Sequence, residues 1–279
     1  MSVHVDPSGR RSVRVEFEVP CTPEQVWHAL ATGPGISSWF VPTTIEEHDG
    51  KPVAINYAFG PGVDIRSTVT AFDEPRMFAQ EAAGWTPDSP AMATEWRIEA
   101  LSGGSCIVRI VHSQFASTDD WDNQLEGAKS GWSGFISILQ IYLKHFSGQR
   151  SAIMQVTTPI TITEAEAWAT LTSALGVKGV SVGESWETPA GVSPLRGVLE
   201  IVTENPNDAL LRLSEPGPGI AAIGTATYPG GQSVVAMNLY MYGDQATANV
   251  ASATPVWQAF LEEHFPMVTA PSASANTSA

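Results

Sequence analysis

A series of six short strand-like runs between residues 43 and 115 constrains the fold more than any other feature of the sequence. Turn residues such as Gly, Pro and Asp separate the runs, and no amphipathic helical stretch lies between them. Parallel strands need long crossover connections, so this spacing predicts an antiparallel sheet joined by hairpins. The runs are Thr43–Glu47, Pro52–Phe59, Val63–Phe72, Arg76–Ala82, Ala93–Leu101 and Cys106–Phe115.

Helical signals flank this series on both sides. Residues 12–19 alternate apolar and polar and predict a first strand, after which Thr22 precedes a proline and a glutamate, a typical helix start. An amphipathic turn follows at 36–40. From about 118 to 146, apolar residues recur at helical spacing and predict a long helix with one buried face: Trp132, Phe135, Ile136, Leu139 and Leu143. The order of elements predicts an α+β fold.

The same order of elements starts again after residue 148. A strand at 153–159 precedes a second capped helix, and Thr22, Trp27 and Leu30 have the same offsets as Thr163, Trp168 and Leu171. The repeat indicates an internal duplication. Further strands are predicted at 180–186, 197–203, 209–215, 221–228 and 233–242, and a final helix at 244–265 that Pro255 should kink or break. We therefore expect domains at 1–148 and 149–268 and a disordered tail at 269–279.

Four segments of the first half resemble a known superfamily. They read T-P-E-Q-V-W-H-A-L, I-S-S-W-F, V-T-A-F-D-E-P-R-M-F and E-G-A-K-S-G-W-S-G-F-I-S-I-L-Q-I-Y-L-K. With them, residues 12–147 resemble the START-like (SRPBCC) superfamily, and within it the activator of heat-shock-protein-90 ATPase homologue-like family. The resemblance implies a helix-grip fold, in which a curved antiparallel sheet wraps around a long C-terminal helix. Residues 151–267 resemble it in topology and in the first helix only, as a second, shorter and degenerate START-like domain.

The resemblance also implies a cavity, because the gap between the long helix and the sheet of such proteins typically holds an apolar small molecule. The members of this superfamily include lipid carriers, polyketide cyclases and hormone receptors, so the fold alone does not assign a reaction. Strand alternation places Val53, Ile55, Tyr57 and Phe59 on one face, and Thr94, Trp96 and Ile98 on one face. The alternative is that these side chains simply fill the core. The residues expected around the cavity are Trp39, Phe40, Tyr57, Phe59, Trp96, Trp132, Phe135 and Leu139.

His112 is the remaining candidate for the ligand-binding site. It alternates with Cys106, Val108 and Ile110, so it should point inward, where a neutral imidazole could orient a ligand oxygen or act as a general base. The alternative is an ordinary hydrogen-bonded interior histidine. The charged residues of neighbouring strands, such as Glu95, are expected to form ion pairs on the outer face.

Composition excludes several classes of function. The chain has 14 basic and 29 acidic side chains and a formal net charge of −15. Such a surface repels phosphate backbones and anionic lipids, so we expect neither a nucleic-acid nor a membrane partner. The polar N-terminus and the absence of a long apolar run predict a cytoplasmic protein. Cys21 and Cys106 have no metal-binding spacing and are expected to be half-buried thiols.

No motif of catalysis or cofactor binding is found in the sequence. It has no G-x-S-x-G, no H-E-x-x-H and no phosphate-binding glycine loop, and Asp119, Asp120 and Asp122 fit helix capping better than a metal site. We therefore assign no catalytic residue, cofactor or metal. The leading hypothesis is a module that binds an apolar or aromatic small molecule. The alternatives are a cyclase, dehydratase or hydrolase that uses the same cavity, and a protein-interaction or co-chaperone-like module, with a homodimer also possible.

Overall fold

The computed structural model describes residues 4–5, 11–59, 64–83, 91–114, 122–202, 207–227 and 231–266. Its first half contains one eight-stranded antiparallel sheet with the strand order β1-β2-β8-β7-β6-β5-β4-β3. The predicted strands, short helices and long helix of this half are confirmed, and β1 is an additional strand that was not predicted. The elements are β1 (His4–Val5), β2 (Arg11–Val19), α1 (Pro23–Ala31), α2 (Gly33–Ser37), β3 (Thr43–His48), β4 (Lys51–Ala58), β5 (Asp64–Asp73), β6 (Met77–Ala82), β7 (Met92–Ala100), β8 (Cys106–Gln114) and α3 (Asp122–His145).

The second half repeats this connectivity with one strand fewer in its hairpin series. In each half the first strand pairs with the last one, β2 with β8 and β9 with β14, and the long helix follows. The chain is therefore a duplicated helix-grip fold. Its second sheet has the order β10-β11-β12-β13-β14-β9. The elements are β9 (Ser151–Pro159), α4 (Glu164–Ala174), β10 (Ser185–Glu187), β11 (Arg196–Val202), β12 (Asp208–Glu215), β13 (Gly219–Thr227), β14 (Ser233–Tyr242) and α5 (Ala246–His264).

The first helix of each copy begins with the same capping box. The hydroxyl of Thr22 accepts a hydrogen bond from the backbone N–H of Gln25, and the Gln25 side chain accepts one from the backbone N–H of Thr22. Thr163 and Glu166 make the equivalent pair at the start of α4. Each box satisfies backbone donors that a helix start otherwise leaves unpaired. The predicted repeat of the first helix therefore has a physical basis, because both copies begin with the same cap.

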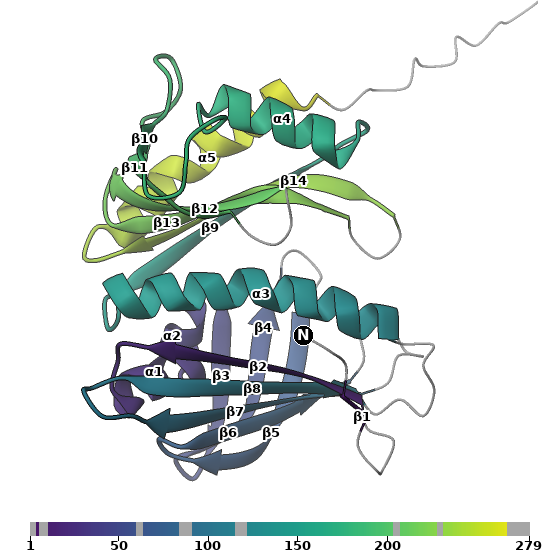
Figure 1. The fold of residues 1–279 in the computed structure, drawn as a ribbon, viewed down its shortest axis with the longest axis vertical. Helices are drawn as coiled ribbons and strands as arrows, with labels where there is room; N and C mark the ends of the chain where they lie inside the picture. The colour runs from purple at the N-terminus through teal and green to yellow at the C-terminus, as the bar shows by residue number, and fades with distance from the viewer. Residues whose placement is uncertain are drawn as a thin grey trace, which may run out of the picture.

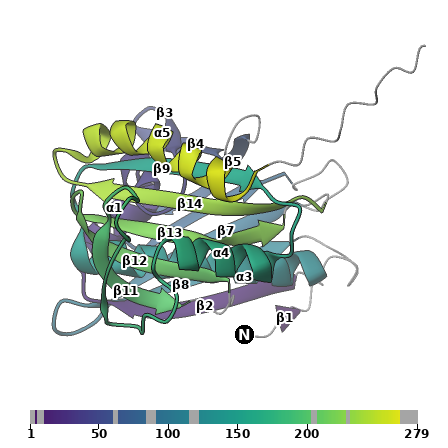
Figure 2. The same cartoon turned by 90° about the horizontal axis from the view of Figure 1, so that it is seen from above.

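The long helix α3 lies between the two sheets (Figure 1). One side packs on the concave face of the first sheet, and the other is covered by second-sheet side chains that belong to the same hydrophobic core: Leu210, Ile220, Tyr240 and Tyr242. Helices α4 and α5 cover the opposite face of the second sheet, with α5 along β9 and β14 (Figure 2). The second sheet is therefore packed on both faces, and the buried residues between 138 and 143 of α3 lie on more than one side of the helix.

One strand of the second half is shorter than predicted, and of the kink or break expected at Pro255 the break is absent. The strand predicted at 180–186 is reduced to β10, because Gly179 and Gly183 adopt φ values of +87° and +88° that interrupt an extended chain. Helix α5 is not broken at Pro255. The proline lies on the exposed side of the helix, where water can bond the backbone carbonyl that the missing N–H leaves free.

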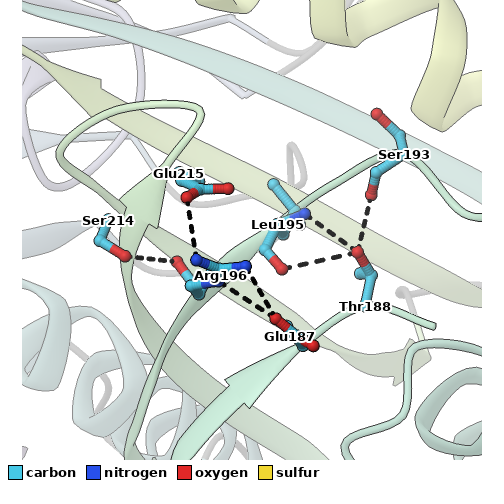
Figure 3. A network of polar contacts seen from close by, with 7 residues as sticks. All are labelled: Glu187, Thr188, Ser193, Leu195, Arg196, Ser214 and Glu215. Atoms are coloured by element: carbon cyan, nitrogen blue, oxygen red, sulfur yellow. Dashed lines mark hydrogen bonds and ion pairs between the residues drawn. The ribbon is translucent and has the colours of Figure 1, made fainter. Parts of the chain in front are cut away.

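A polar network holds the short edge strand β10 against its neighbours (Figure 3). Arg196 of β11 forms ion pairs with Glu187 of β10 at 3.0 Å and with Glu215 of β12 at 3.2 Å. The Thr188 hydroxyl donates to the Ser193 carbonyl at 3.0 Å and accepts from the Leu195 N–H at 3.0 Å. The ion pairs of Arg196 join neighbouring strands at the surface, and the Thr188 contacts stabilise the connection between β10 and β11, so the network has a structural role.

Candidate functional site

The segment that follows α2 places two of the predicted site residues in the interior of the first domain. Helices α1 and α2 are joined without an intervening loop, so the chain turns sharply and Trp39 lies back against α1. The Trp39 indole Nε1–H donates to the carbonyl of Ala29 at 2.8 Å. This bond fixes the ring, and Trp39 and the adjacent Phe40 are both buried.

Phe40 is the centre of an aromatic cluster between α3 and the first sheet. Its ring centroid lies 4.4 Å from that of Phe135 on α3, 5.7 Å from Tyr57 and 5.4 Å from Phe59. Trp39 contacts Phe40 at 5.4 Å and extends the cluster to Trp96 at 5.9 Å. Most of these pairs are edge-to-face, the arrangement that favours aromatic contact beyond the area buried.

The structure therefore brings six predicted site residues into one group of touching rings. Leu139 is fully buried in the same hydrophobic core. Trp132 belongs to α3, but its side chain lies outside the described residues. Val53 does not join this face as expected: its side chain is 38% exposed. The pairing of β3 with β4 shifts between Glu46 and Glu47, and this irregularity breaks the alternation of β4 near Val53.

A row of polar side chains crosses the concave face beside the aromatic cluster. Thr94 on β7 pairs in register with His112 on β8 and with Gln80 on β6. All three are buried, and paired residues share one face of a sheet. Tyr57 reaches Gln80 from β4, across the intervening strand β5. The row His112–Thr94–Gln80–Tyr57, called here the polar row, thus gives an otherwise apolar interior a hydrogen-bonding edge.

Two hydrogen-bonded pairs make up the polar row. The hydroxyl of Tyr57 lies 2.9 Å from Oε1 and 2.6 Å from Nε2 of Gln80. Burial raises the pKa of Tyr57 well above its ordinary value, so the hydroxyl stays protonated. At the other end, Thr94 Oγ1 lies 2.9 Å from His112 Nδ1. Burial lowers the pKa of His112 to about 4, so the imidazole is neutral at pH 7.

The sequence predicts His112 and Tyr57 as site residues but not their hydrogen-bond partners. Strand alternation puts Thr94 on the same face as Trp96, and it puts Gln80 on the same face as Phe78 on β6. The same alternation that selects the aromatic residues therefore contains the signal for both polar ones. The missing information is strand register, which decides that the polar positions of three strands align.

Charged side chains lie on the outer face of the sheet, as expected. Arg97 pairs with Glu95 at 2.6 Å, and Arg109 pairs with Glu16 at 2.5 Å and with Glu99 at 2.6 Å. These pairs are largely solvent-exposed, so each stabilises the fold little. They leave the concave face without any of these charged groups.

A surface hollow of about 890 Å³ lies away from the space between α3 and the concave face of the first sheet. It is formed by α1, the start of α2, the β3–β4 hairpin and the β5–β6 turn, with Trp27 and Phe72 among its lining residues. None of the predicted site residues lines it. It is therefore a separate feature from the aromatic cluster and the polar row.

Other classes of site can be compared with the described residues. Within them, no group of three or more His, Cys, Asp or Glu is placed to hold a metal ion. Among the same residues, no helix is both long and apolar enough to cross a membrane. Cys21 and Cys106 are buried rather than half-buried, and both are free thiols. Asp119 and Asp120 lie outside the described residues, as does the side chain of Asp122.

Comparison with known proteins gives one family match and several similar solved structures. Residues 10–137 match the family described as polyketide cyclase / dehydrase and lipid transport. No curated protein matches the chain. A solved di-domain ARO/CYC, BexL from the BE-7585A biosynthetic pathway, is similar at 14% identity and a TM-score of 0.43, covering 93% of this chain and 100% of its own.

Two further solved structures are similar at the same level. DynU16, described as a putative protein in the dynemicin biosynthetic locus, has 17% identity and a TM-score of 0.41 over 90% of this chain and 96% of its own. CalU16 from Micromonospora echinospora has 17% identity and a TM-score of 0.40 over 51% of this chain and 83% of its own. Because these TM-scores are below 0.5, the duplication rests on the topology of the chain itself. The first domain of this chain is a START-like domain, and its residues 10–137 match the model of the polyketide cyclase / dehydrase and lipid transport family.

Proposed function

We propose that the first domain binds an apolar or aromatic small molecule that carries polar groups, between α3 and the concave face of the first sheet. The polar row beside the aromatic cluster is the observation that carries this proposal. A core that served only for stability gains little from four buried polar side chains, because each must be stripped of water and then given a partner. Such groups in an apolar setting are the usual composition of a small-molecule site.

The chemistry of the polar row suggests what such a ligand presents. A primary amide has two donors and room for more than one acceptor contact, and among the described residues Gln80 bonds to Tyr57 alone. Hydroxyl or carbonyl oxygens on the ligand would suit the amide and the hydroxyl groups. A cationic or anionic ligand would not, since the row contains no side chain that is charged at pH 7. The ligand class that fits is a neutral, partly aromatic, oxygen-bearing molecule.

A cyclase or dehydratase activity at the same place is a second candidate, and the state of His112 favours it. The imidazole is neutral at pH 7, which is the form that a general base requires, and its Nδ1 lies 2.9 Å from Thr94 Oγ1. The match of residues 10–137 to a family that includes polyketide cyclases points the same way. A pKa of about 4 makes a weak base, however, and so binding remains the better-supported function.

Titration with N-phenyl-1-naphthylamine, a neutral aromatic dye that fluoresces in apolar sites, tests the proposal. Wild-type protein should bind the dye at micromolar concentration. Phe40→Leu should raise the dissociation constant about tenfold, because it removes the central ring of the cluster. Phe260→Leu is the matched control, because Phe260 packs in the separate core of the second domain. Failure of wild-type protein to bind, or equal loss in both variants, contradicts the proposal.

A further inference from the structure

Two tyrosines of the second domain are hydrogen-bonded to the backbone that carries the site. The hydroxyl of Tyr240 donates to the carbonyl of Phe40 at 2.9 Å, and the hydroxyl of Tyr242 donates to the carbonyl of Ser38 at 2.8 Å. Trp39 lies between these two carbonyls in the chain. The two bonds therefore bracket the pair of residues, Trp39 and Phe40, that begins the aromatic cluster.

The bracketed segment needs partners from outside its own helix. Ser38 is the C-cap of α2, and the last carbonyls of a helix have no partner within it. Ser38 is only 2% exposed, so water does not replace the missing bonds. Its side chain adds a third link to the second domain, because Ser38 Oγ lies 2.7 Å from Ser151 Oγ on β9.

The tyrosines themselves are held rigidly. The ring of Tyr242 stacks on Phe146 with centroids 4.3 Å apart, and Tyr142 packs beside it at 5.6 Å. Both Tyr240 and Tyr242 are fully buried. Burial raises the pKa of both hydroxyls above the ordinary value, so they remain hydrogen-bond donors at any physiological pH.

We infer that Tyr240 and Tyr242 are positioning residues for the site of the first domain: their hydroxyls fix the backbone of residues 38–40, and through it the directions of Trp39 and Phe40. The second domain then forms part of the site's supporting wall as well as a copy of the fold. That the supported rings bind a ligand rests on the proposed function, whereas the fixing of the backbone does not.

The test compares Tyr240→Phe and Tyr242→Phe in the full chain with Tyr142→Phe. Tyr142 is a buried tyrosine of the same contact region whose hydroxyl accepts from the N–H of Gly148 in its own domain. Hydrogen–deuterium exchange of peptides covering residues 36–43 should rise severalfold in the first two variants and stay at the wild-type rate in the control. Peptides from β7 and β8 report whether a variant loosens the whole domain instead.

Dye binding supplies the functional arm of the same experiment. Each positioning variant should raise the dissociation constant of N-phenyl-1-naphthylamine about fivefold, roughly the effect of one hydrogen bond. Tyr142→Phe should leave the dissociation constant unchanged. Unchanged exchange at 36–43, or raised exchange with unchanged dye affinity, overturns the inference. If wild-type protein does not bind the dye, the proposed function fails, and exchange at 36–43 alone decides whether the hydroxyls hold the segment.

Discussion

The hydroxyl of Tyr242 donates a 2.8 Å hydrogen bond to the carbonyl of Ser38, 204 residues away in the sequence. Ser38 is the C-cap of α2 in the first domain, and Tyr242 is the last residue of β14 in the second. Both groups are buried, so the bond forms inside a continuous hydrophobic core and not across a hydrated domain boundary. The two START-like copies therefore share the core around α3, although each has its own sheet and the second copy has a further core on the other face of its sheet.

A shared interior predicts that the two copies unfold together. Scanning calorimetry of the full chain should give one transition with equal calorimetric and van't Hoff enthalpies, since separating the copies exposes the apolar outer side of α3. A chain cut after residue 148 should self-associate or precipitate, because Tyr142 and Phe146 lose their cover. Two well-separated transitions, or a soluble monomeric fragment, contradict this prediction. The division of the chain at residue 148 itself stays a prediction.

Helical periodicity predicts one buried face of α3 but not the second one, which the other domain covers. The stripe through Phe135, Ile136, Leu139 and Leu143 predicted one buried face, as found in an ordinary amphipathic helix. Ile138, Ile141 and Tyr142 are buried too. The near-continuous apolar run of residues 135–143 carries that signal, but it does not identify what covers the second side. That answer depends on long-range packing by β13 and β14, more than 70 residues away.

Removing one member of the Tyr57–Gln80 pair should cost more than removing both. Gln80→Leu leaves the Tyr57 hydroxyl buried without its partner and should lower the free energy of unfolding by about 2 kcal/mol. Tyr57→Phe/Gln80→Leu should recover part of that loss, because no polar group is then stranded. Urea denaturation of the two single variants and the double variant gives the coupling energy. Strict additivity would mean that the pair contributes nothing as a pair.

His112 should make the fold acid-sensitive over a defined range of pH. Its pKa is about 4 in the folded protein and near 6.5 when unfolded, so below pH 6.5 the unfolded chain binds the extra proton. Stability is complete above pH 6.5 and falls towards pH 4, by about 3 kcal/mol from this residue. The free energy of unfolding, measured by urea denaturation between pH 4 and 7.5, follows the loss.

Two variants assign that pH dependence. His112→Asn should flatten the curve between pH 6.5 and 4 but not abolish its slope, because burial also lowers the pKa of His145. His48→Asn, at a side chain that is 80% exposed, is the surface control for the effect of burial. Glu46 contributes to the pH dependence at lower pH. Arg66 lowers its pKa to about 2, so the stability that the ionised carboxylate provides is lost gradually as the pH falls from 4.5 towards 2. An unchanged slope in His112→Asn contradicts the burial assigned to this residue.

Gly35 and Gly134 should respond oppositely to alanine. A Cβ on Gly35 would lie 1.8 Å from the backbone carbonyl oxygen of His28, so α1 and α2 must separate, at a cost of about 3 kcal/mol. A Cβ on Gly134 of α3 meets no atom within 4 Å among the described residues, and alanine favours the helix by up to about 1 kcal/mol. Thermal unfolding compares the two. A stable Gly35→Ala protein contradicts the close approach of the two helices before Trp39.

The sequence predicted much more of the apolar part of the site than of its polar part. Strand alternation and the resemblance together selected the rings of the cluster, because side-chain direction in a strand follows from parity alone. The polar row depends on the registers of β6, β7 and β8, and a shift of one residue would remove Gln80 from it. The supporting tyrosines depend on domain packing. Neither register nor packing can be read from local pattern.

Native mass spectrometry of the protein purified from its source tests most directly whether the first domain holds a small molecule between α3 and the concave face of its sheet. We expect a reproducible extra mass on the native protein that is absent after denaturation. The mass should correspond to a neutral, partly aromatic compound bearing oxygen, and its occupancy should fall in Phe40→Leu but not in Phe260→Leu. A native mass equal to that of the chain alone, together with no binding of N-phenyl-1-naphthylamine, would contradict the proposed binding of a small molecule.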